Sequence, residues 1–219
     1  MLAGVAAYHA QTAGAIRPTM SGLAHGQSPS GLLLTCADSR VMPSMITHSG
    51  PGDLFTVQNV GNLVSGTSTL AAVQYATSVL RVPLIAVCGR SGCGAMKGLV
   101  DGVPTDMPEG ALGYWLKGGA SSLEAWIDGH PAGRAGARDG FAQNDCLAMV
   151  NVAVQLDRLR ELDVDAELMG CSSTSGRPAS SSTTRMHRSS ARTTAPAARC
   201  RFCADDAGYP REHEPAEES

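Results

Sequence analysis

Three short apolar stretches stand out in the first 90 residues, and turn-forming or polar residues bound each of them. They span residues 31–36 (GLLLTC), 53–61 (DLFTVQNVG) and 82–89 (VPLIAVCG). The first is a continuous apolar run, which is typical of a strand buried on both faces of a parallel sheet, and we expect the second and third to be strands of the same sheet. Between the second and third stretches, apolar side chains recur at helical spacing from Leu70 to Leu80, which predicts a crossover helix. The pattern predicts an α/β fold with a mainly parallel β-sheet flanked by helices.

Helical periodicity continues on both sides of these strands. Apolar positions three and four residues apart over residues 146–159 predict a long amphipathic helix that buries Cys146 in the core. A shorter helix is expected over residues 93–100. Near the N-terminus, residues 5–23 predict two short helices interrupted by Pro18, and we expect them to serve in packing.

The composition changes abruptly after residue 169. Residues 170–201 contain no Val, Ile, Leu, Phe, Tyr or Trp and no acidic residue. Such a segment cannot bury enough apolar surface to offset the entropy of ordering it. We therefore expect one domain over residues 1–169 and a disordered tail over residues 170–219. The Cys200–Cys203 pair in this tail has the C-x2-C spacing that forms one half of many zinc sites. We interpret it as a chance occurrence, because no matching second pair of ligands accompanies it.

Charge and composition narrow the possible partners. The 219 residues are 43% hydrophobic, enough for a substantial core, and carry a formal net charge of −3. With no basic excess, neither a nucleic acid nor an anionic membrane is an expected partner. No apolar run is long enough to cross a bilayer, and the N-terminal segment lacks the pattern of a secretion signal, so we expect a cytoplasmic protein. In a reducing compartment the seven cysteines are expected to be thiols or metal ligands rather than disulfides.

Polar and sulfur-containing residues follow two of the expected strands. In an open parallel sheet, reactive groups collect at the carboxyl ends of the strands. The first strand leads to Cys36, Asp38 and Arg40, and the third leads to Arg90 and Cys93. Two thiolates and a carboxylate can therefore converge at this edge of the sheet.

The motifs around these residues resemble those of the β-class carbonic anhydrases, zinc enzymes that interconvert carbon dioxide and bicarbonate. The resemblance rests on LTCADSRV, GPGDLFTVQNVGN and VCGRSGCGAMK and covers residues 1–169. It is closest to bacterial members, including some that are fused to anion permeases, although this sequence contains no permease segment. It implies carbon dioxide and bicarbonate as substrates, and a homodimer or higher oligomer with the active site near a subunit interface.

The resemblance also implies roles for individual residues. In the family, zinc is held by cysteines matching Cys36 and Cys93 and by a histidine at the position of Arg90. Water, or in a closed form the aspartate matching Asp38, takes the fourth position, and an arginine matching Arg40 pairs with that aspartate. The implied chemistry is attack of zinc-bound hydroxide on carbon dioxide, because zinc lowers the pKa of bound water to about 7.

Arg90 departs from this pattern. A guanidinium stays protonated and has no lone pair for a metal, so the implied site lacks one ligand. Cys36, Cys93 and Asp38 can still hold Zn²⁺ through two sulfurs and one oxygen, but Asp38 is then unavailable to orient hydroxide. Without a metal, Arg90 would instead be a counter-ion for the two thiolates and the carboxylate.

The sequence alone leaves three functions open. The first is carbonic anhydrase activity, impaired in this chain by Arg90. The second is a catalytically silent homologue that binds bicarbonate or another anion, or that pairs with an active subunit. The third is thiol chemistry at Cys93. The family also ends in a further strand and a short helix, which we expect to be missing after residue 169. A frame change near residue 170, natural or from sequencing, would explain the altered C-terminus, and one base change converts a histidine codon to an arginine codon. A decayed or misread gene would therefore explain both Arg90 and the altered C-terminus.

Overall fold

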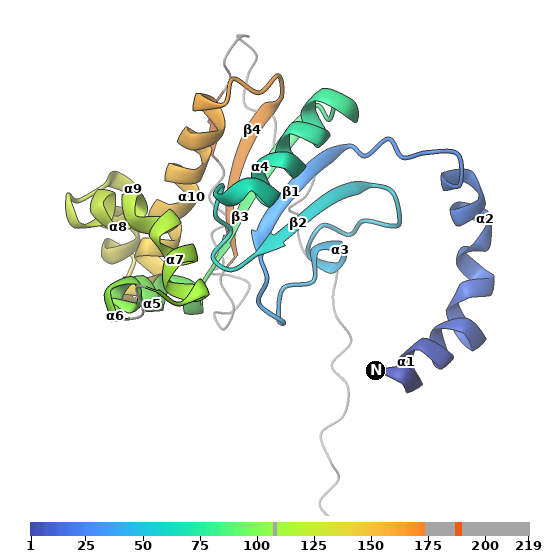
Figure 1. The fold of residues 1–219 in the computed structure, drawn as a ribbon, viewed down its shortest axis with the longest axis horizontal. Helices are drawn as coiled ribbons and strands as arrows, with labels where there is room; N and C mark the ends of the chain where they lie inside the picture. Colours follow the sequence, from blue (N-terminus) through green and yellow to red (C-terminus); the bar gives the residue numbers. More distant parts are fainter. Residues whose placement is uncertain (107–108, 174–186, 190–219) are drawn as a thin grey trace, which may run out of the picture.

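The computed structural model describes residues 1–106, 109–173 and 187–189, and within them the chain forms a five-stranded sheet in the order β2-β1-β3-β4-β5 (Figure 1). The strands are β1 (Gly31–Cys36), β2 (Leu54–Asn59), β3 (Leu84–Arg90), β4 (Glu167–Ser173) and β5 (His187–Ser189). The first four strands run parallel, and β5 pairs antiparallel with β4. The predicted parallel sheet flanked by helices is confirmed, and three of its strands lie within two residues of the expected limits.

The structure describes ten α-helices in residues 1–106 and 109–173, most of which lie on one face of the sheet or at its carboxyl end (Figure 1). In chain order they are α1 (Leu2–Ala7), α2 (Ala13–Leu23), α3 (Pro43–Ile46), α4 (Gly66–Gln74), α5 (Gly94–Val100), α6 (Val103–Asp106), α7 (Ala111–Leu116), α8 (Ala120–Ile127), α9 (Pro131–Arg138) and α10 (Gln143–Glu161). Helices α4 and α10 lie against one face of the sheet, and α5 to α9 gather near the end of β3 (Figure 1). The predicted long helix is α10, and Cys146 is buried in it as expected.

The main core lies between the sheet and helices α4 and α10. Leu32 and Leu34 of β1 contribute to it together with Val152 and Leu156 of α10. Gly170 of β4 lets α10 come close, because a Cβ atom there would lie 2.8 Å from carbons of both Val152 and Leu156. Real side chains do not approach to that distance, so glycine permits the contact between the helix and the sheet.

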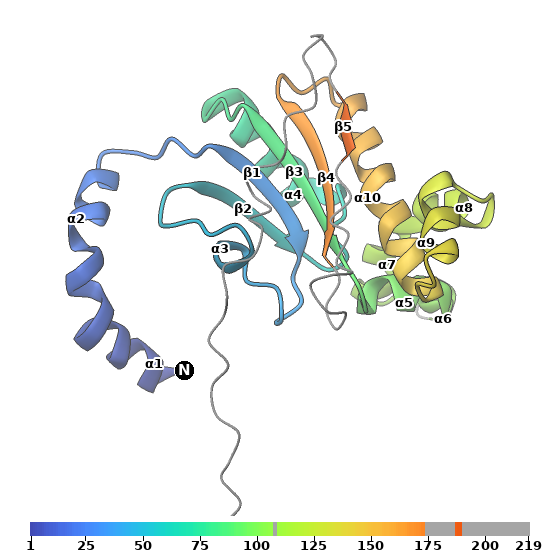
Figure 2. The same ribbon diagram turned by 180° about the vertical axis from the view of Figure 1, so that it is seen from behind.

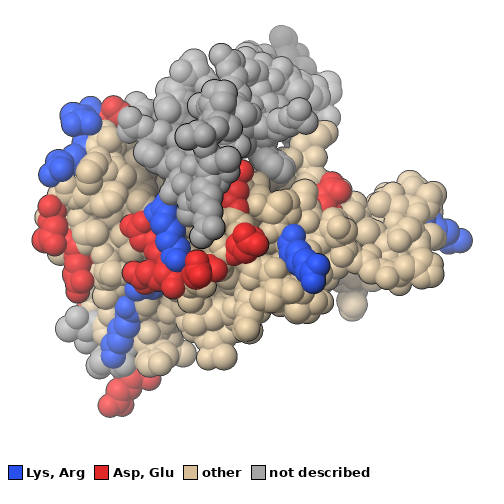
Figure 3. All heavy atoms as spheres, turned by 90° about the horizontal axis from the view of Figure 1, so that it is seen from above, with Lys and Arg blue, Asp and Glu red and all other residues tan. Residues whose placement is uncertain are grey.

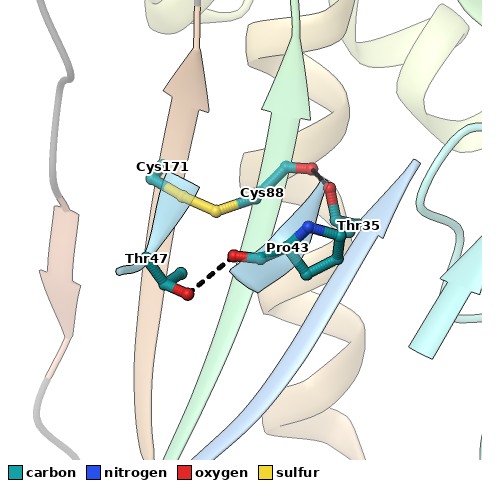
Figure 4. The surroundings of a disulfide bond; sticks show 5 residues. All are labelled: Thr35, Pro43, Thr47, Cys88 and Cys171. Atoms are coloured by element: carbon teal, nitrogen blue, oxygen red, sulfur yellow. Dashed lines mark hydrogen bonds between the residues drawn. A yellow bond between two sulfur atoms is a disulfide. The ribbon is translucent and has the colours of Figure 1, made fainter. Parts of the chain in front are cut away.

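A second, smaller apolar cluster lies on the opposite face of the sheet. It contains Leu33, Ala86 and Cys88, with Cys171 packed against it. Cys88 of β3 and Cys171 of β4 are register partners with Cα atoms 4.7 Å apart, and a disulfide joins them (Figure 4). Thr35 of β1 donates a hydrogen bond of 3.2 Å to the carbonyl oxygen of Cys88. The expectation that the cysteines are not in disulfides is wrong for this pair, because adjacent strands bring the two residues together.

Strand β4 corrects a second expectation. We expected no strand after residue 169, yet β4 extends from Glu167 to Ser173 and pairs with β3 along its length. Backbone hydrogen bonds to β3 hold this strand, so it does not need branched aliphatic side chains. The expected boundary between residues 169 and 170 therefore falls inside β4. Residues 174–186 and 190–219, including the Cys200–Cys203 pair, lie outside the described residues.

The N-terminal segment also differs from its prediction. Residues 2–23 are helical throughout, as α1, a π-helical turn and α2, and Pro18 lies inside α2 without breaking it. No side chain of this segment is buried within the described part of the chain, and the segment stands apart from the sheet (Figures 1 and 2). Because α2 is exposed, water can bond the carbonyl group that Pro18 leaves without a donor. The expected packing of these helices is not found in the single chain.

Charged side chains are spread over the surface. On the face shown in Figure 3, several acidic side chains gather near the centre, whereas the basic side chains are separated from one another. Among the helices that the structure describes, none combines the length and the apolar character needed to cross a membrane.

Candidate metal centre

The strand register brings the ends of β1, β2 and β3 to the same edge of the sheet. Cys36, the last residue of β1, is the register partner of Asn59, the last residue of β2. On the other side of β1, Thr35 pairs with Cys88, so Arg90 at the end of β3 lies at this edge too. The tight connection from β3 to α5 then presents Cys93.

The sulfur atoms of Cys36 and Cys93 lie 4.0 Å apart, and the two residues are only 5% and 1% exposed. Two thiolates on one tetrahedral zinc ion, with Zn–S distances near 2.3 Å, would be about 3.8 Å apart. The hydrogen bond with Cys93 lowers the pKa of Cys36 to about 6, against the opposing effect of burial. Sharing the same hydrogen bond, together with burial, raises the pKa of Cys93. The pair is therefore close enough to bind a single metal ion.

Asp38 is held by Arg40. Its Oδ1 atom accepts hydrogen bonds from the backbone nitrogen of Arg40 at 3.0 Å and from Nε at 2.9 Å, and Oδ2 accepts one from Nη2 at 3.0 Å. These bonds to Arg40, with a smaller effect of Arg90, keep the pKa of Asp38 well below its ordinary value. Asp38 is therefore a fixed carboxylate at neutral pH.

Arg90 points inward toward the same carboxylate. Its side chain is 3% exposed, and Nη1 forms an ion pair with Oδ2 of Asp38. Nη2 donates to the carbonyl oxygens of Ser91 at 2.7 Å and Gly92 at 2.8 Å. Asp145 at the start of α10 accepts a hydrogen bond of 2.6 Å from the Gly92 nitrogen and so fixes this loop. The guanidinium lies where it can act as the counter-ion that we hypothesised.

The residues present do not fit a catalytic zinc ion. Such a site needs three protein ligands, and Arg90 has no lone pair to supply the third. Asp38 is already engaged by Arg40 and Arg90. Across residues 1–106, 109–173 and 187–189, no three His, Cys, Asp or Glu side chains lie close enough together to hold a metal. The two sulfurs are a half-site, and no catalytic step through zinc follows from this structure.

A buried polar network supports the centre, and we did not predict it. Asn151 of α10 donates a hydrogen bond of 2.9 Å to the carbonyl oxygen of Gly61, whose backbone also helps to lower the pKa of Cys36. Gln155, one helical turn further, accepts a hydrogen bond of 2.8 Å from the Val64 nitrogen. The network fixes the loop after β2 beside Cys36. Its sequence signal was two amide side chains four residues apart within an otherwise apolar stretch of helix.

Comparisons with known proteins agree with this fold and centre. A family model described as carbonic anhydrase matches residues 31–171. A carbonic anhydrase of Synechococcus elongatus is 34% identical over 148 residues, which is 63% of this chain and 50% of the relative. One from Pseudomonas aeruginosa is 38% identical over 143 residues, covering 63% of this chain and 62% of the relative. The chain thus spans between half and two thirds of the length of these two relatives.

Solved structures identify the class within this family. The β-carbonic anhydrase CcaA has a TM-score of 0.68 and 29% identity, with 79% of this chain and 81% of that chain covered. A tetrameric β-carbonic anhydrase of Sordaria macrospora has a TM-score of 0.64 and 25% identity, with 85% and 93% covered. The protein therefore belongs to the carbonic anhydrase family, and to its β class.

Proposed function

We propose that the protein acts on carbon dioxide and bicarbonate as a β-class carbonic anhydrase, and that Arg90 makes turnover in this chain slow. The observation that carries the proposal is the group formed by Cys36, Cys93, Asp38 and Arg40 at one edge of the sheet of a carbonic anhydrase family member. Only Arg90 does not match the pattern expected for hydration of carbon dioxide.

The proposed roles follow from the contacts of each side chain. Cys36 and Cys93 would bind the metal, since their sulfurs lie 4.0 Å apart. Arg40 orients Asp38 as a hydrogen-bond acceptor for the attacking oxygen. Arg90 opposes this role, because its ion pair with Asp38 competes for the same carboxylate. Zinc as the cofactor of this chain stays a prediction, and a histidine in place of Arg90 would supply the missing third ligand.

A silent homologue that binds an anion is the second candidate. Arg40 and Arg90 flank Asp38 with two permanent positive charges, and these two guanidinium groups are what would attract a small anion such as bicarbonate. In this case the protein binds bicarbonate without converting it, or pairs with an active subunit.

Assembly as a homodimer or larger oligomer belongs to the same proposal. Apolar side chains of the N-terminal helices, including Leu2, Val5, Tyr8 and Met20, are exposed in the single chain. A second copy of the chain would bury them. Cytoplasmic location also stays a prediction, and the disulfide between Cys88 and Cys171 is a feature that a reducing compartment would oppose.

The deciding experiment is stopped-flow hydration of carbon dioxide with zinc supplied, comparing the natural chain with Arg90→His and Arg90→Gln. We expect Arg90→His to be at least about 100-fold faster, because it adds a metal ligand and releases Asp38. Arg90→Gln removes the guanidinium without adding an imidazole, so it should stay within about 10-fold of the natural chain.

The other outcomes separate the two candidates. Equal, rapid hydration by the natural chain and Arg90→His would show that Arg90 does not limit turnover. Bicarbonate binding to the natural chain, measured by calorimetry, together with no hydration by any of the three proteins, would favour the silent homologue.

A further inference from the structure

We propose that the Cys36–Cys93 pair is a two-coordinate site for a monovalent thiophilic metal ion such as Cu(I) or Ag(I). The inference goes beyond the proposed function, because it concerns a different metal and does not require hydration of carbon dioxide. It rests on two sulfurs 4.0 Å apart, both nearly inaccessible to solvent, beside a buried guanidinium.

The donor set suits such an ion. Zinc in proteins is almost always four-coordinate, whereas this centre offers two sulfurs. Thiolates are soft ligands that select Cu(I), an ion that two of them can satisfy in a linear arrangement. The buried residues clustered with the two cysteines have apolar side chains, namely Leu63, Ala95, Met96, Leu99, Leu116, Leu147 and Ala148. Among residues 1–106, 109–173 and 187–189, no third His, Cys, Asp or Glu side chain lies close enough to the two sulfurs to complete a zinc site.

The formal charges favour a monovalent ion over a divalent one. Two thiolates and Asp38 bring three negative charges, and Arg40 and Arg90 bring two positive charges. A monovalent cation makes this group neutral, whereas Zn²⁺ leaves one positive charge in excess. If residue 90 were a neutral imidazole, the divalent ion would give neutrality. Arg40 is 64% exposed and its charge is screened by water, whereas Arg90 is 3% exposed. Because an uncompensated buried charge is costly, the buried charge that arginine adds in place of histidine shifts the preference from zinc toward a monovalent metal.

Binding needs no change of oxidation state. The ion displaces the thiol protons that the pair still carries, which pass to solvent, and two sulfur–metal bonds form. Arg90 keeps its proton and its contacts with Asp38, Ser91 and Gly92 throughout. Its part is to hold a buried positive charge against Asp38, where it also acts electrostatically on Cys36.

The test uses the full chain carrying Cys200→Ser and Cys203→Ser, because that C-x2-C pair would itself bind thiophilic ions. The protein is purified without oxygen or reductant and titrated with Cu(I), supplied as its acetonitrile complex, against a chromophoric Cu(I) chelator. We expect one high-affinity Cu(I) per chain. Replacing Cys36 or Cys93 by Ser should weaken it by about 100-fold or more, whereas Cys146→Ser should leave it unchanged.

Two further measurements keep the proposal testable if a Cys→Ser variant fails to fold. X-ray absorption of the Cu(I)-loaded protein with both cysteines intact should show two sulfur neighbours and no nitrogen or oxygen neighbour. Competition between Zn²⁺ and Cu(I) should shift toward Zn²⁺ by at least about 10-fold in Arg90→His relative to the protein with Arg90.

Some results would overturn the inference. These are Cu(I) binding that survives loss of Cys36 or Cys93, nitrogen or oxygen neighbours in the absorption spectrum, and unchanged competition in Arg90→His. Rapid hydration by Arg90→His without Cu(I) binding to the natural centre would refute this inference and leave the proposed function standing. Specific Cu(I) binding with no hydration by Arg90→His would support the inference and refute the proposed function.

Discussion

Arg90 illustrates what a single side chain decides in this protein. Its residue type, visible in the sequence, excludes it as a metal ligand. Whether it points into the centre or toward solvent depends on its surroundings, and the structure shows it buried against Asp38 and its own loop. A cation in that position changes both the charge of the centre and the freedom of the carboxylate.

Cys146 provides a prediction at the same scale. Burial, with a smaller effect of the Asp145 charge, raises the pKa of this thiol above its ordinary value of 9.0. The folded chain therefore keeps a proton that the unfolded chain loses above about pH 9, and the free energy of unfolding decreases as the pH rises further. Cys146→Ala should show a shallower loss of stability as the pH rises above 9 than the natural chain.

Urea unfolding at several pH values measures this difference. Cys146→Ala should also be less stable at pH 7 by about 1 kcal/mol, because a buried sulfur is removed. Parallel pH profiles in the natural chain and the variant would show that this thiol is not responsible for the decrease.

Among the elements, those with a strong pattern could be predicted from the sequence. Apolar runs identified β1 and β3, a stretch of mixed apolar and polar residues identified β2, and the apolar stripe identified α10. The part of β4 beyond residue 169 was missed, because residues 170–173 carry no branched aliphatic or aromatic side chain and are recognisable as a strand only from their pairing with β3. The prediction that Pro18 breaks the N-terminal helix was also wrong. Because α2 is exposed, water can bond the carbonyl group that has no N–H donor at Pro18.

The packing of α10 on β3 leads to a prediction at the element scale. A Cβ atom on Gly89 would lie 2.7 Å from a methyl carbon of Val152 and 3.3 Å from the carbonyl oxygen of Ala148. Gly89→Ala should therefore push α10 away and lower the free energy of unfolding by about 1–3 kcal/mol. Gly94→Ala is the matched control, because no atom outside its own helix lies within 4 Å of the added carbon. Its stability should change by no more than about 0.5 kcal/mol.

Denaturant unfolding of the two alanine variants measures these changes in the free energy of unfolding. If Gly89→Ala is as stable as Gly94→Ala, α10 can move without cost and the close contact is not required.

At the scale of the whole molecule, the N-terminal helices contribute little to the fold of one chain. Residues 2–23 bury no side chain within the described residues, although Leu23 approaches Gly52. Deleting residues 2–23 should leave the thermal midpoint of the dissociated protein within about 2 °C of its original value, because few contacts are lost. The same deletion should weaken self-association, because it removes the exposed apolar side chains of α1 and α2.

Light scattering over a range of concentrations measures the association, and calorimetry at low concentration measures the midpoint. An unchanged molar mass after deletion would show that another surface joins the chains. A large drop in the midpoint would show that the helices stabilise the single chain.

The sequence by itself determined the fold class, the family resemblance and the chemical identity of the side chains at the centre. These follow from local patterns and residue types, which do not depend on long-range contacts. Tertiary structure alone decided the 4.0 Å separation of the Cys36 and Cys93 sulfurs, the inward direction of Arg90 and the pairing of Cys88 with Cys171. Each joins residues from different elements or depends on burial, so it exists only once the strands are in register and the helices are packed.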